Sequence, residues 1–374
     1  MRVLFLTNIP SPYRVAFFNE LGKHCELTVL FERQAAKDRN SKWFQNNFEN
    51  FKPIFLKGIY TGSDSALSLS IIKHLSNKKY DIVIIGGYST PTSIIAILNL
   101  WLKKVPFILN ADGGFIRSEG KLKKAIKTFL ISRATWWICS GEYTKKVLQH
   151  YGANPARIYT YPFSSIHDYD ILTSPPTLEE KEKLRKKLGI KGEKIVLSVG
   201  QFIKRKGFDI LIKASKNLLP GTSVYIIGGE PTDEYKQLVR ENGVNDRVYF
   251  LPFKTKQELR EYFIASDVFT LPTREDIWGL VINEAMAYGL PVVTTDKCIA
   301  GIELIKNEEN GYIVPVEDEI TLSEKINVIL SNEMLRNQMI LKNLEVAKVY
   351  TIENMVNKHM KIFENVLEYL NSCC

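Results

Sequence analysis

Two carboxylates stand eight residues apart in the stretch TREDIWGLVINEAMAYGLPVVTTD, residues 273–296. Asp276 precedes an apolar run, and Glu284 lies inside it. A carboxylate among apolar neighbours is costly unless it accepts hydrogen bonds, and the hydroxyls of a sugar or ribose would donate them. The simpler alternative is that Glu284 is an early-helix acid that complements the helix dipole, while Asp276 belongs to the preceding turn.

A second stretch of the chain gathers positive charge. Gly200 and Gln201 follow an apolar strand-like run, and the cations Lys204, Arg205 and Lys206 come directly before a helical pattern. Cations beside a helix N-terminus favour binding of a phosphate group. The start of the helix at residue 279 offers backbone amides for the same purpose. The alternative for residues 204–206 is a basic loop in water.

Both stretches lie where a strand-like run gives way to a helical pattern, and this alternation continues along the chain. It predicts βαβ units with parallel sheets, whose ligands bind at the carboxyl ends of strands. We expect strands at residues 2–8, 26–31, 54–57, 81–86, 106–110, 136–140, 157–161, 194–200, 223–228, 248–251, 268–271 and 292–295. We expect helices at residues 12–23, 67–78, 121–132, 178–188, 207–218, 233–242, 256–263, 280–288, 319–330, 333–349 and 352–370.

Length and composition limit the class of protein. The chain has 374 residues, 45% of them hydrophobic and 24% charged, which is typical of a folded, soluble protein of two domains. No apolar run is long enough to span a membrane, and the N-terminus does not resemble a signal peptide. The five cysteines show no metal-ligand spacing and fit a reducing cytosol, with Cys373 and Cys374 as a frayed tail. We therefore expect a cytoplasmic protein.

The charge is divided unevenly between the two halves of the chain. Residues 1–165 hold 23 Lys and Arg against 10 Asp and Glu, a net charge of +13, whereas the remainder carries −4. A basic half predicts an anionic partner, and nucleic acid, a membrane surface and a phosphorylated substrate are all candidates. The stretch TSPPT at residues 173–177 is typical of a linker between the halves.

The second half of the chain resembles a known family. The segment GLVINEAMAYGLPVV at residues 279–293 is similar to the donor-site signature of the retaining family-4 glycosyltransferases, which have the GT-B fold. The segment VGQ…KG at residues 199–207 fits the same family. Further matching segments stand in the family's order at residues 226–229, 248–251, 266–268 and 310–312. The resemblance spans residues 194–315, whereas the N-terminal half matches only in general plan.

The resemblance implies an α/β GT-B architecture, in which two doubly wound Rossmann-like domains face a central cleft and the C-terminus is helical. Residues 1–172 would form the N-terminal acceptor-binding domain and residues 173–350 the nucleotide-sugar-binding domain. Residues 351–374 would form a helix that crosses back to the N-domain.

The implied reaction moves a hexosyl group from a nucleoside diphosphate sugar, with a UDP-sugar favoured over a GDP-sugar, to an acceptor hydroxyl with retention. The implied setting is assembly of a cell-surface polysaccharide or glycolipid, with a saccharide or lipid-linked saccharide as acceptor. No metal and no cofactor are expected, although the Asp168–Asp170 pattern (DYD) would hold a cation in metal-dependent transferases. A nucleotide-sugar epimerase of the same fold and a basic nucleic-acid-binding protein are the alternatives. No recognised nucleic-acid motif accompanies the basic residues, so no nucleic-acid partner is expected.

The resemblance also assigns roles to single residues. Glu284 would bind the ribose hydroxyls and Asp276 the transferred sugar, although Asp276 stands where a longer glutamate is usual and Glu275 could take its place. Lys206, helped by Arg205, would bind the diphosphate. Residues that complete the donor site would be Gly200, Gln201 (where the family usually has arginine), Phe253 beside the base, and the amides of Gly279, Leu280 and Val281.

The first domain offers weaker signals. The histidine that the family carries there has no clear match, and Asp112 at a strand end is a candidate catalytic contact or else a turn cap. Tyr13 and Arg14 are candidate acceptor-binding residues. Residues 121–131 form a cationic amphipathic pattern, which with Lys103 and Lys104 predicts peripheral binding to an anionic inner membrane face. The alternative is an ordinary helix that packs its apolar side on the sheet.

Overall fold

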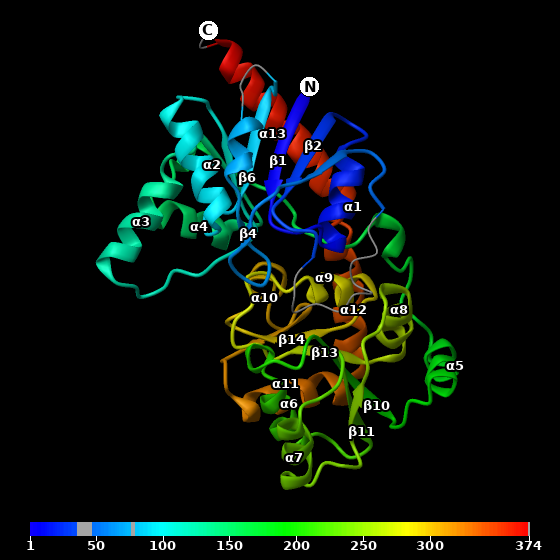
Figure 1. Ribbon diagram of the computed structural model, residues 1–374. Coiled ribbons are helices and arrows are strands. Elements are labelled where there is room, and N and C mark those ends of the chain that lie inside the picture. The colour runs from blue at the N-terminus through cyan, green and yellow to red at the C-terminus, as the bar shows by residue number, and fades with distance from the viewer. Residues whose placement is uncertain (36–46, 76–78, 373–374) are drawn as a thin grey trace. The chain divides into compact units, whose positions relative to one another are not determined.

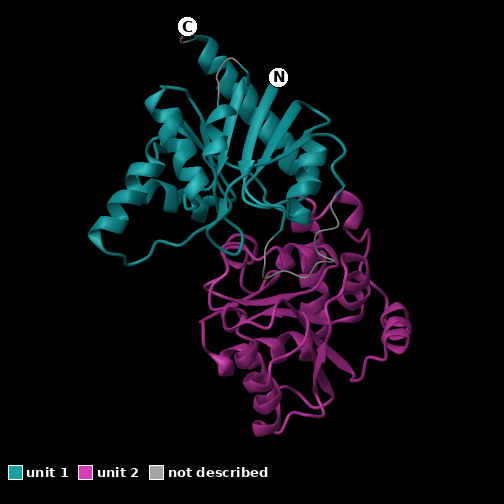
Figure 2. Ribbon diagram, in the orientation of Figure 1, with its two compact units in different colours: residues 1–165, 351–374 teal, residues 166–350 magenta. Residues whose placement is uncertain are grey.

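The computed structural model describes residues 1–35, 47–75 and 79–372 (Figure 1). The chain forms two compact units, residues 1–165 together with 351–374, and residues 166–350 (Figure 2). Cys373 and Cys374, expected to be a frayed tail, lie outside the described residues. No helix in these described ranges is long and apolar enough to cross a membrane.

Unit 1 is built on a seven-stranded sheet in the order β3-β2-β1-β6-β7-β8-β9, in which every neighbouring pair is parallel. The chain order reverses between β1 and β6, which makes that point the place where ligands bind in such sheets. The strands are β1 (Arg2–Thr7), β2 (Glu26–Phe31), β3 (Lys52–Phe55), β6 (Ile82–Gly86), β7 (Ile108–Ala111), β8 (Trp136–Cys139) and β9 (Ile158–Thr160). The helices are α1 (Pro12–Leu21), α2 (Pro91–Leu102), α3 (Lys121–Ile131), α4 (Glu142–His150) and α13 (Ile352–Ser372).

Helix α13 completes the core of unit 1, although it comes last in the chain. It packs against α1, and the ring of its buried His359 lies 4.8 Å from the ring of Phe17. Near its other end, Tyr369 contacts Trp136 and accepts a hydrogen bond from Arg157 at 2.7 Å. The apolar stripe of α13 is thus buried against unit 1 elements (Figure 1).

Unit 2 contains a six-stranded parallel sheet in the order β12-β11-β10-β13-β14-β15, with the reversal between β10 and β13. Its strands are β10 (Lys194–Val199), β11 (Thr222–Ile227), β12 (Val248–Leu251), β13 (Val268–Leu271), β14 (Val292–Thr295) and β15 (Gly311–Val314). Its helices are α5 (Leu178–Leu188), α6 (Phe208–Ser215), α7 (Asp233–Glu241), α8 (Lys256–Ala265), α9 (Leu280–Ala287), α10 (Ile299–Leu304), α11 (Glu319–Ser331) and α12 (Glu333–Ala347). Unit 2 begins before the proline-containing stretch, because Leu172 N donates to Ala287 O and Asp170 pairs with Lys256.

The expected doubly wound α/β architecture and helical C-terminus are confirmed, and the expected strands agree with the observed ones to within two residues at nearly every end. The helix expected at residues 67–78 is wrong. Ala66–Leu67 form strand β5 of a short antiparallel hairpin with β4 (Ile59–Tyr60), and the 3-10 helix η2 covers only Leu69–Lys73. Ser68 causes the change, because its N–H donates to Thr92 and its hydroxyl donates to Lys57 O, which holds the chain extended there. Residues 76–78 of that expected helix lie outside the described residues.

Candidate functional site

Two loops meet at the point in unit 2 where the strand order reverses. One follows β10 (residues 200–207) and the other follows β13 (residues 272–279). The hydroxyl of Thr273 and the N–H of Arg274 both donate to the carbonyl of Arg205 at 2.8 Å. In return the Arg205 guanidinium donates to the carbonyl of Glu275 at 2.8 Å. These reciprocal bonds fix the two loops as one structure.

Gly207 permits the close approach of these loops. Its φ of 68° is in the left-handed region that favours glycine, and a Cβ built on it would lie 1.9 Å from the carbonyl oxygen of Pro272. Any side chain at this position would push the loop of residues 272–279 away. Gly207 is therefore required for the geometry of the site as well as for the turn into α6.

An ion pair joins the two loops at their tips. Lys206 Nζ lies 2.6 Å from Asp276 Oδ2, and the two side chains are only 13% and 11% exposed. Arg205 Nη1 lies 3.5 Å from the same oxygen, on a side chain that is 41% exposed. The backbone of Asp276 is held by Lys297 and Ile299, since its N–H donates to Lys297 O and its carbonyl accepts from Ile299 N. The carboxylate therefore has a fixed position beside two cations.

Helix α9 begins beside this pair. Gly279 is its N-cap residue with φ 98°, and no side chain caps the helix start. The amides of Leu280 and Val281 in the first turn have no intrahelical acceptor by their position. The preceding Trp278 is held in place because its indole N–H donates to Asn283 Oδ1 at 2.9 Å and its carbonyl accepts from Ala300 N at 2.8 Å. The helix N-terminus thus adds partial positive charge next to Lys206.

Glu284 lies one turn further along α9. Its side chain is partly exposed, although its neighbours Ile282, Asn283, Ala285 and Met286 are buried. It is electrostatically close to Tyr288, whose pKa is raised mainly by burial and further by the carboxylates of Asp170 and Glu284. Glu284 is thus partly open to solvent, in the helix that follows the β13 loop.

The other expected donor residues are distributed along this edge. Gly200 and Gln201 lie directly after β10, and the aliphatic stem of Lys206 passes 3.4 Å from a Cβ built on Gly200. Glu275 is partly exposed next to Asp276. Phe253 follows β12, the edge strand, and is partly exposed two strands away from β10. Direct contacts therefore join Lys206, Arg205 and Asp276, whereas Phe253 stands further along the edge.

In unit 1 a polar cluster occupies the carboxyl ends of the strands. Arg14 at the start of α1 is 4% exposed, and its guanidinium donates to Asp112 Oδ2. The other carboxylate oxygen of Asp112 accepts from the Tyr161 hydroxyl at 2.7 Å and from Asn110 Nδ2 at 3.1 Å. The Asp112 side chain is 20% exposed. Arg14 is thus buried and committed to Asp112, which it holds in place.

Two further rings enclose this cluster. His359 of α13 lies 4.5 Å from the ring of Tyr161, its Nδ1 is 2.7 Å from Met355 O, and burial lowers its pKa to about 4. Tyr13 contacts Phe163 edge to face at 5.7 Å, and burial raises its pKa. His359 is therefore neutral at physiological pH, and its ring packs against the cluster.

The sequence did not single out several residues that shape the unit 2 site. Arg274 forms a bidentate pair with Asp209 at 2.7 and 2.8 Å and also donates to Lys204 O. These bonds connect the loop after β13 to the loop after β10 and to α6. Phe202 anchors the same loop through ring contacts with Phe208 and Phe250. The available signals were a lone arginine inside an acid-rich stretch and an aromatic residue shortly after a strand, and neither pattern is specific.

Within residues 1–35, 47–75 and 79–372, no group of three or more His, Cys, Asp or Glu side chains is placed to hold a metal ion. In the DYD stretch, Asp170 is engaged by Lys256 at 2.6 Å and by the N–H of His167 at 2.8 Å. Its carboxylate thus holds together two segments of unit 2.

Comparison with known proteins finds a family model that matches most of unit 2. Residues 180–345 match the model of the family "Glycosyl transferases group 1". An uncharacterized glycosyltransferase of Haemophilus influenzae is 30% identical over 192 residues, which are 50% of this chain and 52% of that protein. The chain spans about half the length of the curated relatives that it matches first. A longer match, 25% identical over 82% of this chain and 84% of the relative, is to an Escherichia coli UDP-Gal:alpha-D-GlcNAc-diphosphoundecaprenol alpha-1,3-galactosyltransferase.

Solved structures show the same fold over the whole chain. Sucrose-phosphate synthase from Thermosynechococcus elongatus superposes with a TM-score of 0.76 at 16% identity and covers 99% of this chain and 100% of its own. A glycosyltransferase from Rickettsia africae gives a TM-score of 0.78 at 15% identity over 98% of both chains. These likenesses confirm the expected GT-B class of the fold.

Proposed function

We propose that the protein is a retaining glycosyltransferase, on the premise that residues 180–345 match the model of the family "Glycosyl transferases group 1". It moves a hexosyl group from a nucleoside diphosphate sugar to a hydroxyl of a saccharide or lipid-linked saccharide. The observation that carries the proposal is the Lys206–Asp276 pair beside the N-terminus of α9, at the strand-order reversal of unit 2. A site of this kind offers charge for a diphosphate and an acid for sugar hydroxyls within a few ångströms.

The donor diphosphate binds to the cationic side of this site. Lys206 and Arg205 supply two positive charges, and the amides of residues 279–281 supply hydrogen-bond donors and the helix dipole. Glu284 accepts hydrogen bonds from the ribose hydroxyls, which is the role that makes a carboxylate favourable among buried neighbours. Asp276 accepts hydrogen bonds from the transferred sugar once the diphosphate takes its place at Lys206.

The chemical step needs stabilisation of the leaving group more than a protein nucleophile. When the bond between the anomeric carbon and the diphosphate oxygen breaks, negative charge develops on that oxygen. Preorganised cations and amides lower the energy of that charge. The acceptor oxygen forms the new bond on the same face of the sugar, and its proton passes to the departing diphosphate oxygen. In this scheme the reaction requires no metal and no cofactor.

The comparison supports a UDP-sugar as donor, because the Escherichia coli relative that aligns over most of the chain is named for UDP-galactose. The same relative acts on a lipid-linked diphosphate saccharide, which supports cell-surface polysaccharide or glycolipid assembly as the setting. A position at the inner face of the cell membrane would suit such an acceptor. In unit 1, Asp112 is the group that would contact the acceptor, with Arg14 as the residue that positions it and Tyr13 next to Arg14 in the chain.

The test is a donor screen with the full chain. Nucleotide release is measured with UDP-, GDP- and ADP-sugars, and thermal stabilisation is measured with the matching nucleotides and with an oligonucleotide. We expect stabilisation by UDP and release of UDP that depends on an added saccharide acceptor, with an α-configured product from an α-configured donor by NMR. Stabilisation by the oligonucleotide alone would overturn the proposal, and so would interconversion of the free UDP-sugar with its epimer.

A further inference from the structure

The outer side of unit 1 exposes apolar residues at the end of α2 and along α3. Leu102, Leu122 and Ile126 are 71%, 76% and 51% exposed. The rings of Trp101 and Phe129 meet edge to face at 5.4 Å and are also exposed. In α3 only Leu130 and Ile131 are buried. The helix therefore leaves much of its apolar stripe outside the core, unlike an ordinary amphipathic helix that packs on a sheet.

Cations surround these apolar residues. The exposed ones are Lys103, Lys104, Lys121, Lys123 and Lys124. The nearby acid Glu119 is already engaged by Lys127 at 3.0 Å and by the hydroxyl of Tyr151. The region formed by residues 101–104, 121–126, 129 and 133, called here the α2–α3 face, is thus both apolar and positively charged.

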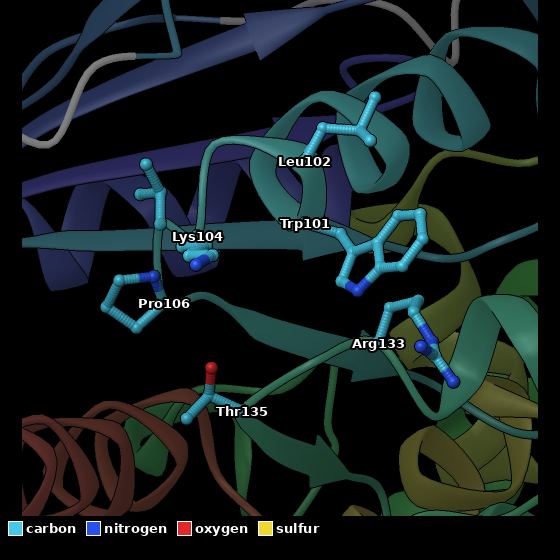
Figure 3. Close-up of a pocket in the computed structure, with 7 residues that line it drawn as sticks. Trp101, Leu102, Lys104, Pro106, Arg133 and Thr135 are labelled. Atoms are coloured by element: carbon cyan, nitrogen blue, oxygen red, sulfur yellow. The ribbon is translucent and has the colours of Figure 1, made fainter.

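A shallow open pocket lies at the edge of the α2–α3 face (Figure 3). Arg133 lies over the rings of Trp101 and Phe129, at 5.2 and 4.7 Å from their centres, and Lys104 and Thr135 line the same pocket. Lys104 has a φ of 53°, a conformation in which glycine is favoured. A lysine in this position places a charge at the rim of the apolar region.

We propose that the α2–α3 face docks unit 1 on an anionic lipid surface. Leucine and isoleucine side chains would enter the acyl boundary, the tryptophan and phenylalanine rings would lie at headgroup level, and the lysines would face the lipid phosphates. A second copy of this chain is a less favourable partner, because a symmetric contact would place lysines opposite lysines. Nucleic acid would leave Leu122 and Ile126 in water. The docking surface consists of unit 1 residues alone, and the proposal does not depend on the proposed reaction.

The test is flotation of the full chain with vesicles of phosphatidylcholine alone and of phosphatidylcholine with phosphatidylglycerol. We expect flotation with the anionic vesicles only, and weaker flotation at high salt because screening shortens the reach of the lysines. The double variant Lys123→Gln with Lys124→Gln should weaken vesicle binding roughly 25-fold, because each basic residue near the surface contributes about fivefold. Leu122→Ser with Ile126→Ser should weaken it by more than about tenfold, since two apolar side chains leave the acyl boundary.

Matched controls lie on unit 2. Lys183→Gln with Lys186→Gln removes the same charge from the exposed side of α5, and Leu178→Ser with Leu341→Ser removes two exposed apolar residues. Both controls should float like the wild type. Equal flotation with neutral and anionic vesicles, or equal losses in the face variants and the controls, would overturn the proposal. Two other results would also overturn it if the chain does not bind vesicles. One is self-association in sedimentation velocity that the face variants abolish, and the other is oligonucleotide binding that the face variants abolish.

Discussion

The Lys206–Asp276 pair allows a prediction in which two adjacent changes act in opposite directions on nucleotide binding. The ammonium and the carboxylate lie 2.6 Å apart, and their side chains are 13% and 11% exposed, so the pair remains partly open to water. If Lys206 holds the diphosphate, Asp276 competes with that diphosphate in the free protein. Lys206→Met removes a hydrogen bond to a charged group, worth about 1.5–3 kcal/mol. Asp276→Asn removes the competing charge, worth about 1 kcal/mol for a partly exposed pair.

These energies translate into measurable affinities, because each 1.4 kcal/mol is about tenfold in Kd. Lys206→Met should weaken UDP binding about 10- to 100-fold. Asp276→Asn should leave UDP binding unchanged or tighten it up to about fivefold. At the same time Asp276→Asn should slow sugar transfer by about 100-fold, since a carboxylate that accepts from the transferred sugar is lost. Calorimetric titration of UDP and coupled release of UDP from the sugar nucleotide measure the two effects separately.

A control is available in the same loop. Lys204→Met removes an exposed side chain of equal charge, and we expect its UDP affinity to stay within about threefold of wild type because exposed charges are screened. The reasoning would be refuted if Asp276→Asn weakened UDP binding as strongly as Lys206→Met. It would also be refuted if Lys206→Met and Lys204→Met were indistinguishable.

Three further predictions concern binding and stability. Glu284→Gln should raise the Kd for UDP about tenfold in calorimetry with an unchanged melting temperature, since it weakens the bonds to the ribose hydroxyls. Gly207→Ala should lower the free energy of unfolding in urea by about 3 kcal/mol or more, whereas Gly243→Ala, with φ 65° but no atom within 4 Å of the new Cβ, should cost only about 1 kcal/mol. Burial raises the pKa of the Glu32 carboxyl to about 7 from 4.5, so the folded state binds the extra proton and stability falls as pH rises from 4.5 to 7. Burial lowers the pKa of His359 to about 4 from 6.5, so the contribution of His359 to the free energy of unfolding rises with pH over nearly the same interval. Glu32→Gln removes only the opposing contribution of Glu32. Urea titrations at pH 4 to 8 should therefore show the stability of this variant rising with pH by about 2 kcal/mol more than that of the wild type.

Much of the fold was predictable because its signals are local. Apolar runs bounded by turn residues mark the parallel strands, and Thr177 and Thr255 with their capping-box partners Glu180 and Glu258 mark the starts of α5 and α8. The failure at residues 67–78 has a tertiary cause, since bonds from Ser68 to distant residues override a helical pattern there. Such a contact leaves no mark in local periodicity.

The candidate site was likewise predictable only in part. Acids and cations at the ends of β10 and β13 could be found from the sequence because residue type and position after a strand are both local. The direct contact of Lys206 with Asp276 could not, because 70 residues separate them and their distance depends on how two loops are held. That holding comes from Arg274 and from the bare backbone of Gly207. The burial of Arg14 against Asp112 is likewise a property of packing, as the two residues are 98 positions apart in the chain.

The place of α13 in unit 1 has a consequence for the order in which the protein can fold during synthesis. All of unit 2 leaves the ribosome before Ile352, the first residue of α13. Domains fold as units while the chain emerges, so unit 2 can complete its core early. Unit 1, although it is translated first, must wait with Phe17 and the ring of Tyr161 uncovered until α13 arrives. A released chain that ends before residue 352 would therefore contain every element of the second unit but lack the last helix of the first.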